Sequence, residues 1–163
     1  WVFIEWQKFG KPSLVGIVTG TIAGLATITP ASGFVGPIGG ICIGLAGGFV
    51  CYYAVGVIKD AWNLDDSLDV FAVHGVGGIL GTLLVAVFAA EGLGGVGYGE
   101  GGSMGSQIVT QAIGVVGTVV WTVLATWIIC KVVAGLAGGL RAADEEITEG
   151  LDLSYHGERD YNF

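Results

Sequence analysis

Four long apolar stretches separated by short polar segments dominate the chain. They cover residues 12–29, 34–58, 69–90 and 106–137. At a rise of 1.5 Å per residue, each stretch is long enough to cross a hydrocarbon core about 30 Å thick. The pattern therefore predicts an all-α integral membrane protein with four complete transmembrane helices.

Turn and capping residues separate the four stretches. Pro12 and Ser13 suit a helix start. Residues 29–33 contain a proline and a glycine and permit a tight reversal. Residues 63–67 supply caps before the third stretch, and the glycine-rich residues 92–105 are expected to form a loop.

Composition supports a membrane protein. Hydrophobic residues make up 53% of the 163 residues and charged residues only 12%, about half of what a soluble domain carries. The net charge of −8 comes mostly from the tail and one loop, and there is no basic patch, so no nucleic acid partner is expected. The opening residues 1–6 carry two tryptophans and no start methionine, which suggests the end of an earlier span and a chain that is a fragment.

The basic residues give an independent test of the span count. In a four-span arrangement all six lie on one side of the membrane, and the loops on the other side contain none. The positive-inside rule then places this side, together with the C-terminal tail, in the cytoplasm. We expect a transmembrane region over residues 1–140 and a cytoplasmic tail over residues 141–163. The six residues are Lys8, Lys11, Lys59, Lys131, Arg141 and Arg159.

Glycines recur at intervals of four residues within the spans. This spacing places them on one helix face, where the backbones of neighbouring helices can approach closely. We therefore expect a tightly packed helix bundle. The rows are Gly16, Gly20 and Gly24; Gly36, Gly40, Gly44 and Gly48; and Gly77 and Gly81.

The three cysteines do not suggest a disulfide framework. Cys42 and Cys51 would lie about 13 Å apart along one helix, which is too far for a bond. Cys130 lies in another span. We expect all three to be small, buried, free thiols.

One ionisable side chain, His74, lies well inside the third span. Such residues are costly in a membrane and are usually functional, and a histidine exchanges protons near neutral pH. Its helical face is expected to include Val70, Phe71, Gly77, Gly78 and Gly81, with the glycines leaving space beside the imidazole. Two alternatives remain open: a core histidine bonded to a neighbouring carbonyl, and a haem or metal ligand, for which no second membrane-embedded histidine is present. His156, in the polar tail, is expected to be solvated.

Three aspartates cluster at the cytoplasmic end of the third span. Asp65 and Asp66 are expected to cap the helix and to interact favourably with its dipole. Asp69 is nearer the histidine face, and a role in attracting cations stays open for it.

The segment Asp69-Val70-Phe71-Ala72-Val73-His74-Gly75-Val76-Gly77-Gly78 resembles the histidine-bearing segment of the ammonium transporter (Amt/Mep/Rh) family. Further pieces occur in the order found in that family, at residues 10–13, 29–35, 93–98, 139–141 and 149–158. The resemblance covers essentially the whole chain and favours the Amt branch.

This resemblance implies a fold of eleven membrane helices with two inverted five-helix repeats, assembled as a homotrimer in the plasma membrane. The chain would be the C-terminal half, from the end of the seventh helix through the eleventh. His74 would be one of two pore histidines, Val70 would line the pore below it, and Thr29 and Asp69 are further candidates. Because the other histidine belongs to the first half, the chain alone is not expected to conduct.

The implied activity is transport, not catalysis, and it needs no cofactor. Ammonium is recruited and deprotonated, ammonia crosses the hydrophobic pore, and the tail packs near a docking PII signalling protein. Two other classes remain: an ammonium sensor with the same fold, and a membrane enzyme or electron-transfer subunit that uses His74 as a cofactor ligand.

Overall fold

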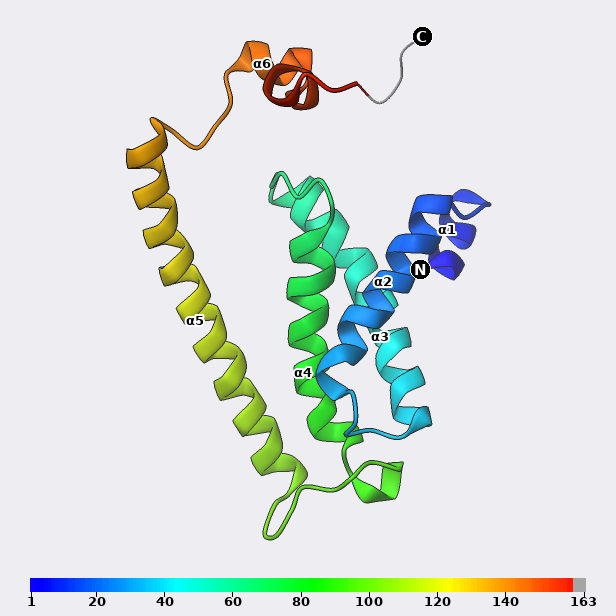
Figure 1. Cartoon of the computed structure of the whole chain (residues 1–163). Coiled ribbons are helices and arrows are strands. Elements are labelled where there is room, and N and C mark those ends of the chain that lie inside the picture. Colours follow the sequence, from blue (N-terminus) through cyan, green and yellow to red (C-terminus); the bar gives the residue numbers. More distant parts are fainter. Residues whose placement is uncertain (160–163) are drawn as a thin grey trace. The chain divides into compact units, whose positions relative to one another are not determined.

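The computed structural model describes residues 1–159, and within that range the chain is helical, with no strand (Figure 1). The chain divides into two compact units, Trp1–Gly117 and Thr118–Phe163. The division falls inside the longest helix, α5 (Met104–Ala137). Of the tail expected over residues 141–163, the structure describes residues 141–159.

Four helical segments are long and apolar enough to cross a membrane, which confirms the all-α membrane fold predicted from the sequence. The first is α2 (Leu14–Ile28) with a following 3-10 turn (Thr29–Ala31). The second is α3 (Pro37–Gly56) with a π-helical turn (Val57–Ala61). The third is a π-helical turn (Phe71–Gly75) continued by α4 (Val76–Phe88), and the fourth is α5.

The helix ends follow local chemistry. The Ser13 hydroxyl accepts the backbone N–H of Gly16 at 2.8 Å and so caps α2. Pro37 begins α3, at the position where its missing N–H costs nothing. The third span is shorter than the 69–90 expected, because a turn precedes Phe71 and the chain leaves the helix after Phe88.

Helices α2, α3 and α4 pack around Thr27, whose side chain is fully buried. The Thr27 hydroxyl donates to the Ala23 carbonyl at 2.7 Å, which satisfies it within its own helix. A methyl group added to Gly47 of α3 would collide with the Thr27 side chain, and one added to Gly77 of α4 would lie 2.9 Å from its oxygen. The close packing expected for Gly77 and Gly81 is therefore present, with Thr27 as the common contact.

The glycine row expected to pack on α3 is covered only in part: Gly48 is buried, and a Cβ at Gly36 would lie 2.5 Å from the Gly94 carbonyl oxygen. A Cβ at Gly44 would lie in open space, and one at Gly40 or Gly48 would make only ordinary contacts. A second row, one position earlier, is buried throughout and consists of Gly39, Ile43, Gly47 and Cys51. Both rows have the same four-residue spacing, so only the positions of α2 and α4 decide how much of each row is covered.

The short helix α1 (Val2–Phe9) is attached to α2 and α3. Lys8 Nζ lies 4.9 Å from the ring centroids of both Tyr52 and Tyr53, within cation–π range. The Glu5 carboxylate accepts the backbone N–H of Ser13 at 2.7 Å. These contacts fix the start of α2 against the end of α3.

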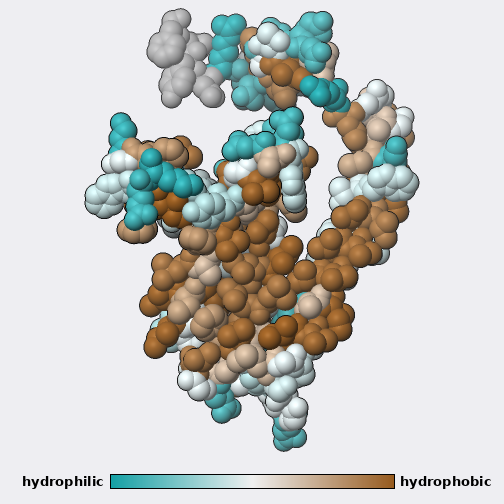
Figure 2. All heavy atoms as spheres, turned by 180° about the vertical axis from the view of Figure 1, so that it is seen from behind, coloured by the Kyte–Doolittle hydropathy of each residue, from teal (hydrophilic) through white to brown (hydrophobic). Residues whose placement is uncertain are grey.

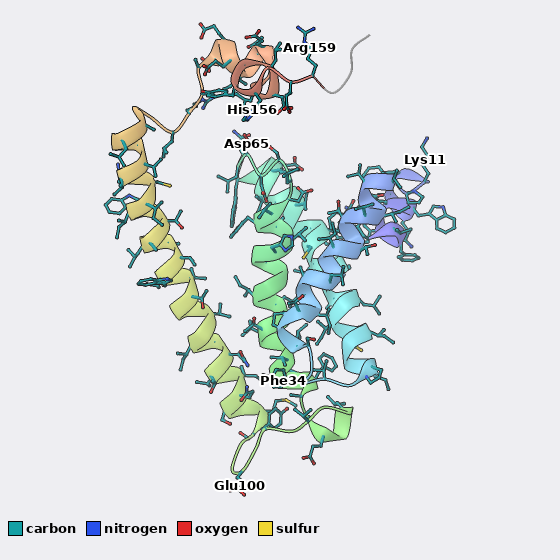
Figure 3. All side chains as sticks on the ribbon, in the orientation of Figure 1. Lys11, Phe34, Asp65, Glu100, His156 and Arg159 are labelled. Atoms are coloured by element: carbon teal, nitrogen blue, oxygen red, sulfur yellow. The ribbon has the colours of Figure 1, made fainter. Side chains whose placement is uncertain are left out.

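At the opposite end of the first unit, two loops are bonded together. The N–H of Val96 donates to the Phe34 carbonyl at 3.2 Å. The Tyr98 hydroxyl donates to the Ala86 carbonyl at 2.8 Å and so satisfies the end of α4. Figure 3 shows Lys11 and Asp65 at one end of this unit, and Phe34 and Glu100 at the other. Lys8, over Tyr52 and Tyr53 near the end of α3, and Lys59, paired with Asp69, lie toward the end that carries Lys11 (Figure 3), as the charge pattern predicts.

The helices of the first unit present a largely hydrophobic outer surface (Figure 2). Exposed side chains such as Leu14, Ile38 and Leu45 are each at least 70% accessible. Of the three free cysteines, Cys51 is buried, Cys42 is exposed and Cys130 is partly exposed. The expectation of burial thus holds for Cys51 and is wrong for Cys42, whose side chain points away from the three-helix contact.

The second unit contains a structured part of the tail. Helix α6 (Asp144–Glu149) is followed by a π-helical turn (Asp152–His156). One Glu146 oxygen accepts both the backbone N–H of Ala143 at 2.8 Å and the Tyr155 hydroxyl at 3.0 Å. This carboxylate caps α6 and ties the two helical segments of the tail together.

Candidate functional site

The segment before His74 is fixed by Asp66. Its two carboxylate oxygens accept the backbone N–H groups of Val70, Phe71 and Ala72 at 2.8, 3.0 and 3.1 Å. These are the N–H groups that the start of a helix leaves without an intrahelical partner. The capping role expected for Asp66 is therefore present. Asp65 instead accepts the Ser67 hydroxyl at 2.7 Å and does not cap the helix.

Asp69 is held by an ion pair. Its Oδ1 lies 2.6 Å from Lys59 Nζ, which comes from the π-helical turn at the end of α3. The backbone of Asp69 has φ 56°, in the left-handed region that residues other than glycine seldom adopt. Lys59 thus neutralises Asp69, and Asp65 and Asp66 carry the remaining negative charge of the loop.

His74 lies in a widened turn. The backbone N–H of Val76 donates to the carbonyl of Phe71, five residues earlier, which makes Phe71–Gly75 a π-helical turn. Such turns are rare in helices and occur often at functional sites. Nothing in the residue spacing of this segment predicts it.

His74 and Val70 are both exposed on the surface of this chain, and a Cβ at Gly78 would meet nothing within 4 Å. Val70, His74 and Gly78 thus form a row along the third span that the other described residues of the first unit leave uncovered. The expectation that Gly77 and Gly81 leave space beside the imidazole is wrong, since both glycines are buried against Thr27. A π-helical turn shifts the rotation of residues before it relative to those after it, so a face counted at 3.6 residues per turn does not continue across it.

Thr29 lies far from the other candidates. A Cβ at Gly81 would approach Thr27 and Pro30, so this end of α2 lies level with Gly81, about 10 Å along α4 from His74. The Thr29 hydroxyl donates to the Leu25 carbonyl at 2.6 Å and is satisfied there. The structure therefore groups His74, Val70 and Asp69 on one segment and leaves Thr29 apart. Nothing in the residue pattern pointed to Thr27, against which Gly47, Gly77 and Gly81 pack, because a threonine four residues after Ala23 and two before a turn does not reveal its contacts.

Among residues 1–159, no three His, Cys, Asp or Glu side chains gather closely enough to hold a metal ion. The alternative in which His74 ligates a metal gains no support from this part of the chain. What the segment offers instead is an imidazole beside apolar groups and an unfilled glycine position.

Comparison with known proteins relates the whole chain to one family. The family model described as "Ammonium Transporter Family" matches residues 1–161. A protein named "Ammonium transporter" from Aquifex aeolicus is 43% identical over 165 residues, which are 99% of this chain and 38% of that protein. One with the same name from Bacillus subtilis is 42% identical over 166 residues, covering 99% of this chain and 40% of the relative.

A solved structure agrees in fold. The protein titled "Sensor Amt Protein" superposes with a TM-score of 0.82 at 31% identity, over 94% of this chain and 37% of that one. The chain thus spans about two fifths of the length of the relatives it matches, and their names describe transporters, not enzymes. On the family model and on these identities, the chain belongs to the Ammonium Transporter Family.

Proposed function

We propose that the complete protein containing this sequence transports ammonium or ammonia across a membrane through a hydrophobic pore, with His74 as a pore residue. The observation that carries the proposal is the row of Val70, His74 and Gly78, which lies uncovered on an apolar span. The family model matches residues 1–161, which include this row. A surface of this kind suits a passage completed by further helices.

The physical chemistry favours passage as ammonia. Removing an ammonium ion from water into an apolar passage costs far more than removing a neutral molecule that can form hydrogen bonds. A histidine can accept a hydrogen bond from the molecule, donate one to it, and exchange a proton near neutral pH. In this scheme His74 bonds the deprotonated molecule, and Val70 lines the passage one turn away.

Asp69 and Thr29 have smaller roles in the proposal. Asp69 is neutralised by Lys59, so it contributes by holding the segment more than by attracting cations. The Thr29 hydroxyl donates a hydrogen bond to the Leu25 carbonyl, so its oxygen can take part in a further hydrogen bond only as an acceptor.

The test is uptake of methylammonium by liposomes that contain the complete protein. His74→Ala and His74→Asp are expected to change the rate or the selectivity of uptake while the protein still elutes as a folded species. His156→Ala, which alters the tail histidine, serves as the control. Uptake unchanged by both substitutions at His74 in well-folded protein would remove this residue from the passage.

A second candidate function is sensing of ammonium. It is favoured by the structural neighbour titled as a sensor, which shares 31% identity and the fold. The same liposome experiment separates the two functions, because a sensor would bind the ion and show no flux above that of empty liposomes. Binding without flux would replace the transport proposal with the sensor proposal.

We also propose the assembly and orientation that the family resemblance implies: a homotrimer in the plasma membrane, with the tail in the cytoplasm and a PII signalling protein docking beside it. Lys11 lies at the same end of the first unit as Asp65 (Figure 3), Lys8 lies over Tyr52 and Tyr53 near the end of α3, and Lys59 pairs with Asp69; this grouping supports the orientation through the positive-inside rule. Protease added to sealed spheroplasts should spare the tail; cleavage from outside would reverse the orientation. A mass measurement in detergent, with and without PII protein, tests the trimer and the partner.

A further inference from the structure

The phase of the π-helical turn decides which way His74 faces. In a regular α-helix, seven residues rotate the chain by about 700°, which would leave His74 within about 20° of Gly81. Gly81 packs against the Thr27 backbone so closely that even a methyl group there would collide with its carbonyl oxygen. Nearer to His74 on the same side, a Cβ at Gly77 would lie 2.9 Å from Thr27 Oγ1 and 3.2 Å from Cys51 Sγ, and Val73 packs with Ala23 and Cys51, so an imidazole turned this way would meet packed side chains. The widened turn is therefore what keeps His74 on the uncovered row.

The start of this turn is held from two directions. Asp66 accepts the backbone N–H groups of Phe71 and Ala72 in the turn and of Val70 just before it. Asp69 supplies two further attachments: its carbonyl accepts the N–H of Val73 at 2.8 Å, and its carboxylate pairs with Lys59. Lys59 is the only one of these groups that belongs to the preceding span, α3 with its π-helical turn, so it alone ties the His74 segment to that span through a charge.

The backbone at Asp69 lies in the left-handed region, which aspartate adopts more often than most residues other than glycine. Residues other than glycine in the left-handed region persist where their surroundings hold them. The side chain of Asp69 is 18% exposed and that of Lys59 35%, so the pair is partly shielded from water. An unpaired carboxylate in this position would draw the backbone toward water and release the turn.

We propose that the Lys59–Asp69 ion pair is a positioning device: it fixes the start of the π-helical turn and thereby the direction in which His74 faces. The expected effect on transport rests on the proposed function. The effect of the ion pair on the direction of His74 does not depend on that function. Lys59 and Asp69 are positioning residues, because they act on the passage through the turn.

The structural part is tested by labelling. In the complete protein with its native cysteines replaced, His74→Cys is allowed to react with 2-aminoethyl methanethiosulfonate. Lys59→Met or Asp69→Asn should lower the reaction rate at this position by about fivefold or more, because the turn relaxes and residue 74 rotates toward Thr27. The double charge reversal, Lys59→Asp with Asp69→Lys, should restore most of the rate. Asp65→Asn, which removes a carboxylate from the same loop but leaves the pair intact, should change nothing.

The transport part is tested with His74 in place. Each single substitution should lower kcat/KM for methylammonium uptake by about tenfold. The loss should fall mainly on kcat, because the substitution misplaces His74, which acts on the transported molecule, and leaves the binding of methylammonium less affected. The charge reversal should recover uptake, which a general loss of stability would not allow. Unchanged labelling in both single variants, or failure of the charge reversal to restore it in folded protein, would overturn the proposal. Altered labelling in a protein that shows no uptake would keep it and reject the transport function instead.

Discussion

Replacing Gly81 by alanine should destabilise the three-helix contact by a measurable amount. The added methyl group would collide with the Thr27 carbonyl oxygen, lie 2.9 Å from the Thr27 carbonyl carbon and come within 3.3 Å of Pro30 Cδ. Two of these neighbours are backbone atoms, which cannot turn away as a flexible side chain can. The helices must therefore separate locally, and overpacking of this kind costs about 1–3 kcal/mol.

The exchange of glycine for alanine also has an opposite effect. In a helix interior it is favourable by roughly 0.8–1 kcal/mol when nothing collides. Gly78→Ala serves as the reference for this gain, because it lies in the same helix, its Cβ would meet no atom of the described residues within 4 Å, and the proposed function places it beside the open passage. The difference between the two variants then reports the collision alone, about 1–3 kcal/mol.

The assay is thermal unfolding of the detergent-solubilised complete protein, followed by size-exclusion chromatography of the fraction that stays soluble. Gly81→Ala should have a lower Tm than Gly78→Ala, and Thr27→Ala should not rescue it, because the collision is with backbone. Gly77→Ala should be partly rescued by Thr27→Ala, because there the nearest atom is the threonine oxygen at 2.9 Å. Equal Tm values for Gly81→Ala and Gly78→Ala would refute close contact between Gly81 and the Thr27 backbone.

Two further outcomes are expected. Asp66→Ala should lower stability by about 0.5–2 kcal/mol because three backbone N–H groups lose their acceptor, whereas Asp65→Ala, measured by the same thermal assay, should have little effect. In the tail, the hydrogen bond to the Glu146 carboxylate, and the negative charge of that group, raise the pKa of Tyr155 above its ordinary value. A raised pKa means that this bond stabilises the tail below the ordinary tyrosine pKa of about 10 and is lost as the pH rises through the raised value. A spectrophotometric titration at alkaline pH should therefore show one tyrosine whose pKa falls in Glu146→Gln and whose signal disappears in Tyr155→Phe; an identical titration curve for Glu146→Gln would contradict the bond.

Much of the fold follows from the sequence. Apolar runs of 18 residues or more predict membrane helices because the backbone must satisfy its own hydrogen bonds in lipid. The capping role of Asp66 and the clustering of basic residues at one end are equally local, and both are readable from residue type and position. The resemblance to ammonium transporters rests on short segments in a fixed order, and the family match over residues 1–161 bears it out.

The contacts between helices could not be read in this way. Two adjacent rows of α3 share the same spacing, and only the positions of α2 and α4 cover Gly39 and Gly47 and leave Gly44 open. Thr27 is one of several threonines in apolar surroundings, and its place at the centre of the contact depends on both neighbouring helices.

The direction of His74 was decided by tertiary structure as well. The sequence places a histidine inside a span, because residue type and distance from the span end are properties of the chain alone. A π-helical turn, however, has no fixed residue pattern, and a single extra residue in one turn changes the face of everything before it. The turn here is held by Lys59 on another span and by packing at Gly81, so only the folded chain determines that His74 lies beside Val70 on the uncovered row and away from the buried glycines.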